Sequence, residues 1–303
     1  MLNARFQNLI GQAYKLLLRI KCAIINRWYE YTYELRVNLK RVSGVTTKKR
    51  QQEVIVSLTT IPERIGKVHL CIESLLRQSV KPDRLILWLS ESSEPGRPEL
   101  GKNTLPSKLI RLQKRGLEIR WCEDIRSFRK IIPALRLFPQ ALIVTSDDDV
   151  FYPVDWLEHL YDAYCREPEF IHCHRAHLIK YTSTGAVLPY GQWNICSPDI
   201  VGPSYELFPT GVGGVLYAPG HLHPQVLDQE IFLVLCPTAD DVWLKTMSLL
   251  NNVKCKKVAP KVISYIEIRI PNNRVLSHHN VNSNGNDVQI SRVSKRYKVF
   301  IKN

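Results

Sequence analysis

Residues 53–90 read EVIVSLTTIPERIGKVHLCIESLLRQSVKPDRLILWLS, and their pattern of apolar residues indicates a strand, a helix and a second strand. Two apolar runs at 54–58 and 84–90 have the length and the β-branched or aromatic content of buried strands. Between them, near 65–78, the apolar residues fall on one face of a helix. A strand, a helix and a second strand in this order predict a right-handed βαβ unit on a parallel sheet.

The same alternation continues further along the chain. Strands are expected at 117–121 and 141–145, and helices near 106–115, 128–137 and 153–166. The predicted fold class is therefore α/β, with a mostly parallel twisted sheet flanked by helices. Because ligands of such sheets bind beyond the carboxyl ends of the strands, the loops that follow the strands are the place to look for chemistry.

The composition excludes several classes of protein. The 303 residues are 45% hydrophobic and 23% charged, which is ordinary globular usage and not that of a disordered, collagenous or polytopic membrane protein. The eight cysteines include no C-x-x-C pair, so we expect reduced thiols and a cytoplasmic location. The first strand is followed by no G-x-G-x-x-G, and no G-x-x-x-x-G-K-[ST] occurs, which argues against ordinary dinucleotide and P-loop sites.

The first fifty residues carry most of the basic excess. Basic residues exceed acidic ones by 14 in the whole chain, and residues 1–50 hold eleven basic and two acidic side chains. The spacing of apolar residues over 2–40 predicts an amphipathic helix, and 42–52 has the pattern of a linker. Basic residues interrupt every apolar stretch of this leader, so neither a signal peptide nor a membrane-spanning helix is expected there.

Three interpretations of the leader are open. The helix can pack on the body of the protein, or it can lie through residues 1–40 on an anionic membrane surface, peripheral on the cytoplasmic face of the inner membrane. Trp28, Tyr29, Tyr31 and Tyr33 suit the headgroup boundary of such a membrane. Nucleic acid is the least favoured partner, because the basic and aromatic residues match no known reader pattern.

Three consecutive carboxylates, Asp147, Asp148 and Asp149, follow the strand expected at 141–145. Adjacent carboxylates repel one another, and burial without a cation would raise their pKa values. A divalent ion resolves the conflict, and carboxylates together with phosphate oxygens suit Mg²⁺ or Mn²⁺. The alternative is that the aspartates cap a helix that starts near Pro153, but capping accounts for one aspartate and not for three.

Three motifs carry a family resemblance. They are V-I-V-S-L-T-T-I-P-E-R at 54–64, S-L-L-R-Q-S-V-K-P-D-R-L-I-L-W-L at 74–89 and T-S-D-D-D-V-F-Y-P-V-D-W-L at 145–157. Together they resemble bacterial nucleotide-sugar-dependent glycosyltransferases of the GT-A fold, of the kind that builds surface polysaccharides. The resemblance covers roughly 53–290.

The resemblance divides the chain into parts. It implies a nucleotide-binding half over 53–152 and an acceptor half over 153–290. Residues 1–50 then form the basic leader and linker, and 291–303 a basic C-terminal tail.

The resemblance also implies roles for particular residues. In that family a D-x-D motif holds the Mn²⁺ or Mg²⁺ that bridges the two donor phosphates. Asp147 and Asp149 satisfy this spacing, whereas counting back from Pro153 selects Asp148, so the register stays open. By the same resemblance, four residues should touch the nucleotide and one should lie near its phosphates. They are Thr59, Pro62, Arg64 and Asp124 for the nucleotide, and Lys130 for the phosphates. The alternative is that these residues only form surface ion pairs or start helices.

The second half offers further candidates. The resemblance places Gly213 and Gly214 beside the donor sugar, within an uncharged run over 207–227 that is expected to be loop. Asp240 and Asp241 begin a helix that is expected to continue through residue 249. They either cap this helix or, by the resemblance, Asp241 is the base of an inverting enzyme and Asp240 its orienting or acceptor-binding partner.

Two groups of histidines are also conspicuous. In this family a histidine after the core is a common third metal ligand. This chain has histidines at 278 and 279, and we expect His279 to be the ligand. His172, His174 and His177 have a zinc-like composition but no matching cysteine or aspartate set, which favours a strand and a turn with possible substrate contacts.

The function expected from the resemblance is metal-dependent sugar transfer. The donor would be a nucleotide-sugar, and the acceptor a saccharide or lipid-linked saccharide in cell-surface polysaccharide or lipopolysaccharide synthesis. One alternative is a sugar-nucleotide pyrophosphorylase, although such enzymes have a G-x-G-x-R loop where this chain has Thr-Thr-Ile-Pro. Another is a non-catalytic scaffold that binds a membrane or nucleic acid through the basic leader.

Overall fold

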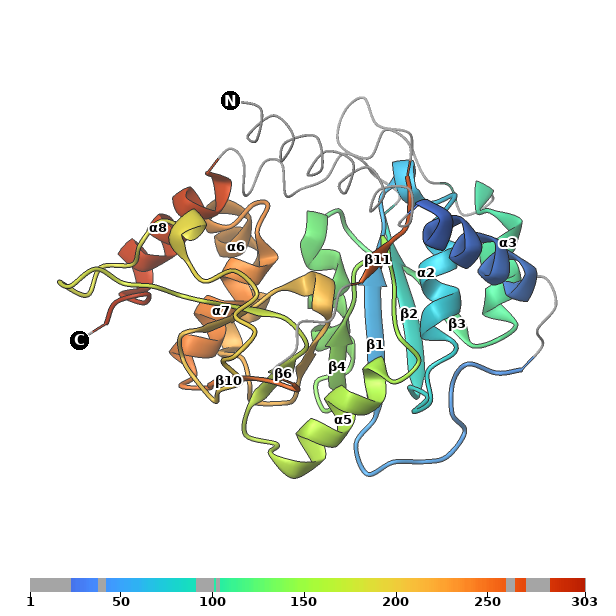
Figure 1. Ribbon diagram of the computed structural model, residues 1–303, viewed down its shortest axis with the longest axis horizontal. Helices are drawn as coiled ribbons and strands as arrows, with labels where there is room; N and C mark the ends of the chain where they lie inside the picture. Colours follow the sequence, from blue (N-terminus) through green and yellow to red (C-terminus); the bar gives the residue numbers. More distant parts are fainter. Residues whose placement is uncertain are drawn as a thin grey trace, which may run out of the picture.

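The computed structural model describes residues 23–37, 42–90, 101, 104–259, 265–270 and 284–302. The expected metal ligand His279 and the first part of the expected leader helix lie outside these ranges. The predicted fold class is confirmed: a mostly parallel sheet is covered on both faces by helices (Figure 1). Among the described residues, no helix combines the length and the apolar character needed to cross a bilayer.

The main sheet has seven strands in the described part of the chain, in the order β10-β6-β9-β4-β1-β2-β3. Their bounds are β1 (Val54–Thr59), β2 (Arg84–Leu89), β3 (Leu117–Trp121), β4 (Leu142–Thr145), β6 (Ile171–Cys173), β9 (Val215–Tyr217) and β10 (Cys255–Lys257). Strand β9 is antiparallel to its neighbours β4 and β6, whereas the other neighbouring pairs are parallel. The first four strands lie where the sequence predicts them.

Two short antiparallel pairs add to the main sheet. Strand β5 (Val150–Phe151) pairs with β11 (Ile266–Glu267), and β7 (Ala176–Leu178) pairs with β8 (Leu207–Pro209). Strand β5 follows the acidic triplet directly, so the triplet lies in the short connection between β4 and β5.

The predicted helices are present, with one break. The α-helices that carry labels are α2 (Val68–Leu75), α3 (Ser107–Gln113), α4 (Ile132–Leu137), α5 (Trp156–Arg166), α6 (Gln229–Leu235), α7 (Asp240–Leu250) and α8 (Gly285–Tyr297). The helix expected near 128–137 is divided into a 3₁₀ turn, η3 (Arg126–Lys130), and α4. Pro133 lies in the first turn of α4, where its missing N–H breaks no helical hydrogen bond.

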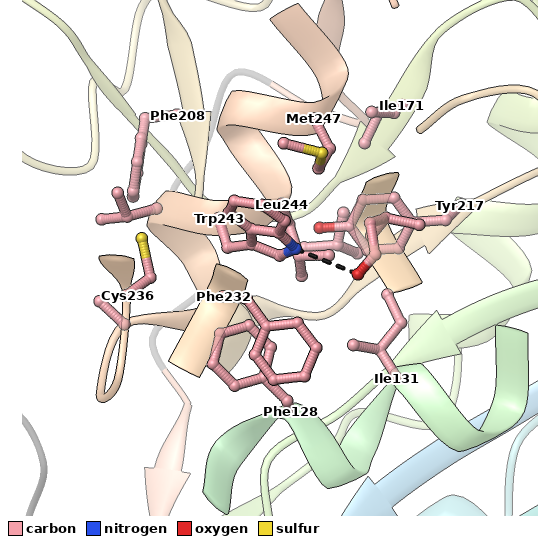
Figure 2. Close-up of a cluster of buried hydrophobic side chains, with 14 of the residues drawn as sticks. Phe128, Ile131, Ile171, Phe208, Tyr217, Phe232, Cys236, Trp243, Leu244 and Met247 are labelled. Atoms are coloured by element: carbon pink, nitrogen blue, oxygen red, sulfur yellow. Dashed lines mark hydrogen bonds between the residues drawn. The ribbon is translucent and has the colours of Figure 1, made fainter. Parts of the chain in front are cut away.

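Each face of the sheet has its own core, because side chains alternate along a strand. On one face Val54, Val56 and Leu58 pack under α2, α3 and α5. On the other face Ile55 belongs to the core formed by α4, α6, α7 and α8. Figure 2 shows part of this second core, where the Phe128 ring stacks on Phe232 with 4.1 Å between centroids. Trp243 of α7 lies beside them and donates its indole N–H to the Val226 carbonyl at 3.1 Å.

The order of the strands creates a switch point between β1 and β4. From β1 the chain crosses through α2 to β2 and through α3 to β3, always away from β4. It then returns through α4, on the opposite face of the sheet, to β4 on the other side of β1. In open α/β sheets the crevice for ligands lies at such a point, outside the carboxyl ends of the strands.

Two sequence-based expectations differ from the structure. The prediction of loop over 207–227 is wrong in part, because this run contains β8 and β9, and β9 is an inner strand with all three residues buried. Three-residue strands between prolines and glycines are too short to show a period-2 pattern. The boundary expected at residue 291 falls inside α8, where Ile290, Val293 and Phe300 belong to the core.

The N-terminal segment packs on the body. Residues 23–37 form a helix that buries Tyr33 and Val37 against the core beside α2, which confirms the packed interpretation for this part of the leader. Residues 42–52 form neither helix nor strand, and hydrogen bonds such as Gly44 N to Arg115 O at 2.8 Å fix them to the body. No disulfide joins the seven cysteines in the described ranges.

Candidate active site

The acidic triplet lies at the carboxyl end of β4, beside the loop that follows β1. Arg64, at the end of the 3₁₀ turn η1 (Pro62–Arg64), places Nη1 2.6 Å from Asp148 Oδ1 and 2.9 Å from Asp149 Oδ2. Thr60 donates its hydroxyl to Asp148 Oδ2 at 2.5 Å. Helix α5 begins only at Trp156, with Asp155 at its N-cap, so the alternative that the triplet caps this helix is wrong.

Lys130 joins the triplet to the acidic pair on α7. Its Nζ lies 3.0 Å from Asp147 Oδ1 and 2.9 Å from Asp240 Oδ2, and only 9% of its side chain is exposed. Burial alone would lower the pKa of this ammonium, but the surrounding aspartates outweigh it and raise the pKa well above its ordinary value. Lys130 is therefore a permanent cation between two motifs more than ninety residues apart in sequence.

The position of Lys130 is set from the core. The hydroxyl of Ser57 on β1 donates to the Lys130 carbonyl at 2.6 Å, and the Trp88 indole N–H donates to the same hydroxyl at 2.9 Å. The neighbouring strands β1 and β2 thus hold the turn that carries the lysine.

Asp241 faces the glycine turn η5 (Gly211–Gly213). The backbone N–H of Gly211 donates to Asp241 Oδ2 at 3.1 Å. Helix α7 has Ala239 as its N-cap and no side-chain cap, so the carboxylates of its first turn face the site instead of closing their own helix. Burial and the neighbouring Asp240 raise the pKa of Asp241 to about 7, against the opposing charge of Lys130. A carboxyl group with this pKa can both take up and release a proton near neutral pH.

Asp149 has a similar electrostatic environment. Burial, followed by the charges of Asp148 and Asp147, raises its pKa to about 7, although Arg64 acts in the opposite direction. Two carboxyl groups of the site thus hold protons more tightly than ordinary aspartates, first because they are buried and then because neighbouring carboxylates add negative charge.

The residues of the site fit a divalent cation with a phosphate ligand. The site holds five carboxylates, at 147–149, 240 and 241. Four of them form ion pairs in the described residues, all with Arg64 or Lys130, and Asp241 accepts the Gly211 N–H instead. The Ser146 hydroxyl, next to the triplet, is buried and has no hydrogen-bond partner among the described residues. No set of three side chains in the described ranges could hold a metal alone, but Mg²⁺ usually takes one or two carboxylates and completes its shell with phosphate and water.

Gly211 keeps the centre of the site open. A Cβ at this position would lie 2.6 Å from Lys130 Nζ, 3.2 Å from Asp147 Oδ1 and 3.4 Å from Asp241 Oδ1. Only glycine therefore leaves the two acidic motifs and the lysine in their observed positions. Sequence analysis missed this residue, although it lies in the glycine-dense run that ends at Gly214.

Tyr152 is a second residue that sequence analysis missed. Its hydroxyl accepts the backbone N–H of Asp147 at 2.8 Å and donates to the Val212 carbonyl at 3.3 Å. It ties the triplet to the glycine turn, and it is buried. Thr60 was also missed, since a threonine after a strand carries no distinguishing signal.

Three of the expected nucleotide contacts have structural roles in the protein. Thr59 donates its hydroxyl to the Trp88 carbonyl at 2.9 Å, and Pro62 begins η1. Asp124 accepts the backbone N–H of Arg126 at 3.0 Å, which stabilises the turn before η3. Within the described ranges, no contact joins Asp124 to the triplet, so its role toward a nucleotide stays a prediction.

Packing requires glycine at both 213 and 214, since a Cβ on Gly213 would lie 2.7 Å from the Arg175 Cβ and one on Gly214 would enter the Trp156 ring. The Gly213 carbonyl accepts hydrogen bonds from the Trp156 indole at 2.8 Å and from the Tyr265 hydroxyl at 2.9 Å. Gly214 has φ +86°, and a Cβ there would lie 2.3 Å from the Trp156 ring. Their proximity to a donor sugar stays a prediction.

The histidine cluster belongs to β6, β7 and the turn between them, as expected. His172 and His174 bond through Nε2 to the carbonyls of Glu167 and Trp156, and His177 accepts the N–H of Cys196. Burial lowers the pKa of all three rings. Each ring therefore has a local partner for one nitrogen, as expected of neutral histidines in a core.

Comparison with known proteins gives a remote likeness. No protein-family model matches the chain, and no curated protein matches it. Among solved structures it is similar to the mannosyltransferase PcManGT from Pyrobaculum calidifontis in complex with GDP-Man and Mn²⁺. The identity is 13% and the TM-score 0.47, over 91% of this chain and 74% of that one. A likeness at this level is evidence neither for a ligand nor for a reaction.

Proposed function

We propose that this protein is a metal-dependent, inverting glycosyltransferase that moves a sugar from a nucleotide-diphosphate donor to a saccharide or lipid-linked saccharide acceptor. The observation that carries the proposal is the meeting of two acidic motifs, Asp147–Asp149 and Asp240–Asp241, around Lys130 at the switch point of the sheet. Sugar transfer from such a donor needs a place for the diphosphate and a base for the acceptor hydroxyl, and the two motifs can supply one each.

The triplet is the proposed donor end of the site. A divalent cation held by one or two of Asp147, Asp148 and Asp149 would supply Lewis-acid chemistry that neutralises the departing diphosphate. Arg64 and Lys130 are cations within ion-pair distance of the same carboxylates. They can turn toward phosphate oxygens when these arrive, because guanidinium and ammonium groups bind either type of anion.

Asp241 is the proposed base. It would accept the proton of the acceptor hydroxyl as that oxygen attacks the anomeric carbon and the bond to the diphosphate breaks. Its raised pKa, about 7, matches a proton acceptor that works near neutral pH, and the Gly211 N–H fixes one of its oxygens. Asp240, which forms an ion pair with Lys130, then either orients the Asp241 carboxylate or contacts the acceptor.

Nucleotide release from a panel of nucleotide-sugars in the presence of Mn²⁺ tests the proposal. The wild-type protein should release nucleoside diphosphate from at least one donor, and removal of the metal by a chelator should abolish the release. Asp155→Asn is the matched control, since Asp155 is also an aspartate at a helix start but is half exposed and outside the site. Equal release by Asp155→Asn and by a triple alanine variant of the triplet would contradict the proposal.

A further inference from the structure

The inner face of the helix over residues 23–37 is fixed to the body. The rings of Tyr29 and Tyr33 lie 5.4 and 5.0 Å from the ring of Phe151, and the Arg77 guanidinium lies 5.1 Å from the Tyr33 centroid. Asn26 donates a hydrogen bond to the Glu267 carbonyl on β11. In Figure 1 this dark blue helix lies beside α2 and α3, at the end of the molecule away from α8.

The outer face carries a stripe of large apolar side chains. Ile24, Trp28, Tyr31 and Leu35 follow one another at spacings of four, three and four residues, which places them along one side of the helix. Their exposed fractions are 65%, 64%, 61% and 40%. A continuous apolar stripe of this kind, unlike single exposed residues, indicates an interaction surface.

The charges of the helix are divided between the two faces. Glu30 lies 3.4 Å from the Lys67 ammonium, and Glu34 lies 2.6 Å from Lys108 Nζ and 2.9 Å from His69 Nε2, so both acids are paired with the body. Arg27, next to the stripe, is exposed. The outer face is thus apolar and cationic, and residues 1–50 as a whole carry a net charge of +9.

We infer that this stripe, Ile24, Trp28, Tyr31 and Leu35, docks on an anionic membrane surface. Tryptophan and tyrosine have an apolar body and a polar tip, which suits the boundary between acyl chains and headgroups. Basic residues beside them are attracted to anionic lipids. A second copy of the chain is the less suitable occupant, because the exposed cation Arg27 beside the stripe would face the same cation of the other copy and be repelled by it.

Docking would also orient the active site. Phe151, on which the helix packs, follows the acidic triplet by only two residues. A membrane-bound helix would therefore fix the orientation of the segment that carries the triplet relative to the bilayer, as a lipid-linked acceptor would require if the proposed function holds.

Co-sedimentation with lipid vesicles tests this inference. The full chain is incubated with vesicles of phosphatidylcholine alone or mixed with phosphatidylglycerol, and the bound fraction is measured at low and high salt. The wild-type protein should bind the anionic vesicles, less well at high salt. The double variant Trp28→Ser/Tyr31→Ser should partition at least about tenfold less, because the two largest apolar groups of the stripe are lost.

The control variant is Val234→Ser on α6. Val234 is 68% exposed, as much as Trp28, but lies on α6, which packs on the other face of the sheet, so its replacement should leave binding unchanged. Circular dichroism checks that both variants fold. We expect them to do so because the substituted side chains are exposed and do not contribute to the core. The inference is overturned if the wild-type protein does not bind, if the double variant binds as the wild type does, or if the stripe only mediates a dimer detected by light scattering.

Discussion

Replacing Gly211 by alanine would place a methyl group among three charged atoms. The new Cβ would lie 2.6 Å from Lys130 Nζ, whereas ordinary contacts are at least 3.4 Å, so the ammonium must move by about 0.8 Å. Its ion pairs with Asp147 and Asp240, now 3.0 and 2.9 Å long, would lengthen accordingly. Coulomb's law with an effective dielectric constant of about 20 gives a loss of about 1 kcal/mol for each pair.

Two effects combine in the free energy of unfolding. The lost attraction of about 2 kcal/mol is partly offset, by about 0.4–1 kcal/mol, because alanine restricts the unfolded chain more than glycine does. We expect Gly211→Ala to lower the free energy of unfolding by about 1 kcal/mol, as measured by urea denaturation. Donor-dependent turnover should fall about tenfold or more, because the lysine and both acidic motifs are displaced together.

Gly191→Ala is the matched control. A Cβ at Gly191 would have no heavy atom within 4 Å, so this variant should keep both the stability and the turnover of the wild-type protein. If Gly211→Ala and Gly191→Ala behaved alike in both assays, Lys130 would not be held where the structure places it, and the electrostatic account of the site would be refuted.

Three further predictions concern the same site. Asp241→Asn should reduce turnover by about 10²–10⁴-fold while donor binding in calorimetry persists; turnover like that of the wild type would exclude Asp241 as the base. Since the pKa values of Asp241 and Asp149 are raised from 3.8 to about 7, the folded state retains protons that the unfolded state has lost. Stability to urea should therefore fall from about pH 4 to 7, while turnover rises through about pH 7; a flat turnover profile would contradict this. Gly214→Ala should lower the free energy of unfolding by about 2 kcal/mol or more, because φ is positive and Trp156 occupies the space; an unchanged melting temperature would contradict it.

The first half of the fold could be predicted from the sequence because its strands are long. The four strands from β1 to β4 are four to six residues long and alternate with amphipathic helices, so each run has enough residues to show a period. Strands β6, β9 and β10 have only three residues each, and their pairing is fixed by contacts between distant segments. Nothing in a three-residue run identifies β9 as an inner, antiparallel strand.

The candidate site was predictable as separate motifs and not as an arrangement. Consecutive aspartates after a strand draw attention to the triplet, and Asp240–Asp241 is recognisable as a second acidic pair. Their meeting around Lys130 depends on the switch between β1 and β4, and no spacing in the sequence encodes it. Gly211 and Tyr152 act only through neighbours that the fold provides.

The leader illustrates the same limit in a different way. Helical periodicity predicted the helix, but Tyr29 and Tyr33 face the body while Trp28 and Tyr31 face outward. All four are aromatic, and a helix with apolar residues on two faces gives no sequence signal for which face is buried.

Titration calorimetry of the wild-type protein with nucleoside diphosphates, with and without Mn²⁺, tests whether the acidic triplet binds a divalent cation together with a diphosphate. We expect uptake of at least one nucleoside diphosphate in a manner that depends on Mn²⁺. This uptake should be lost when Asp147, Asp148 and Asp149 are replaced by alanine and should persist in Asp155→Asn. Absence of Mn²⁺-dependent uptake for every nucleoside diphosphate, or full uptake by the triple variant, would contradict this expectation.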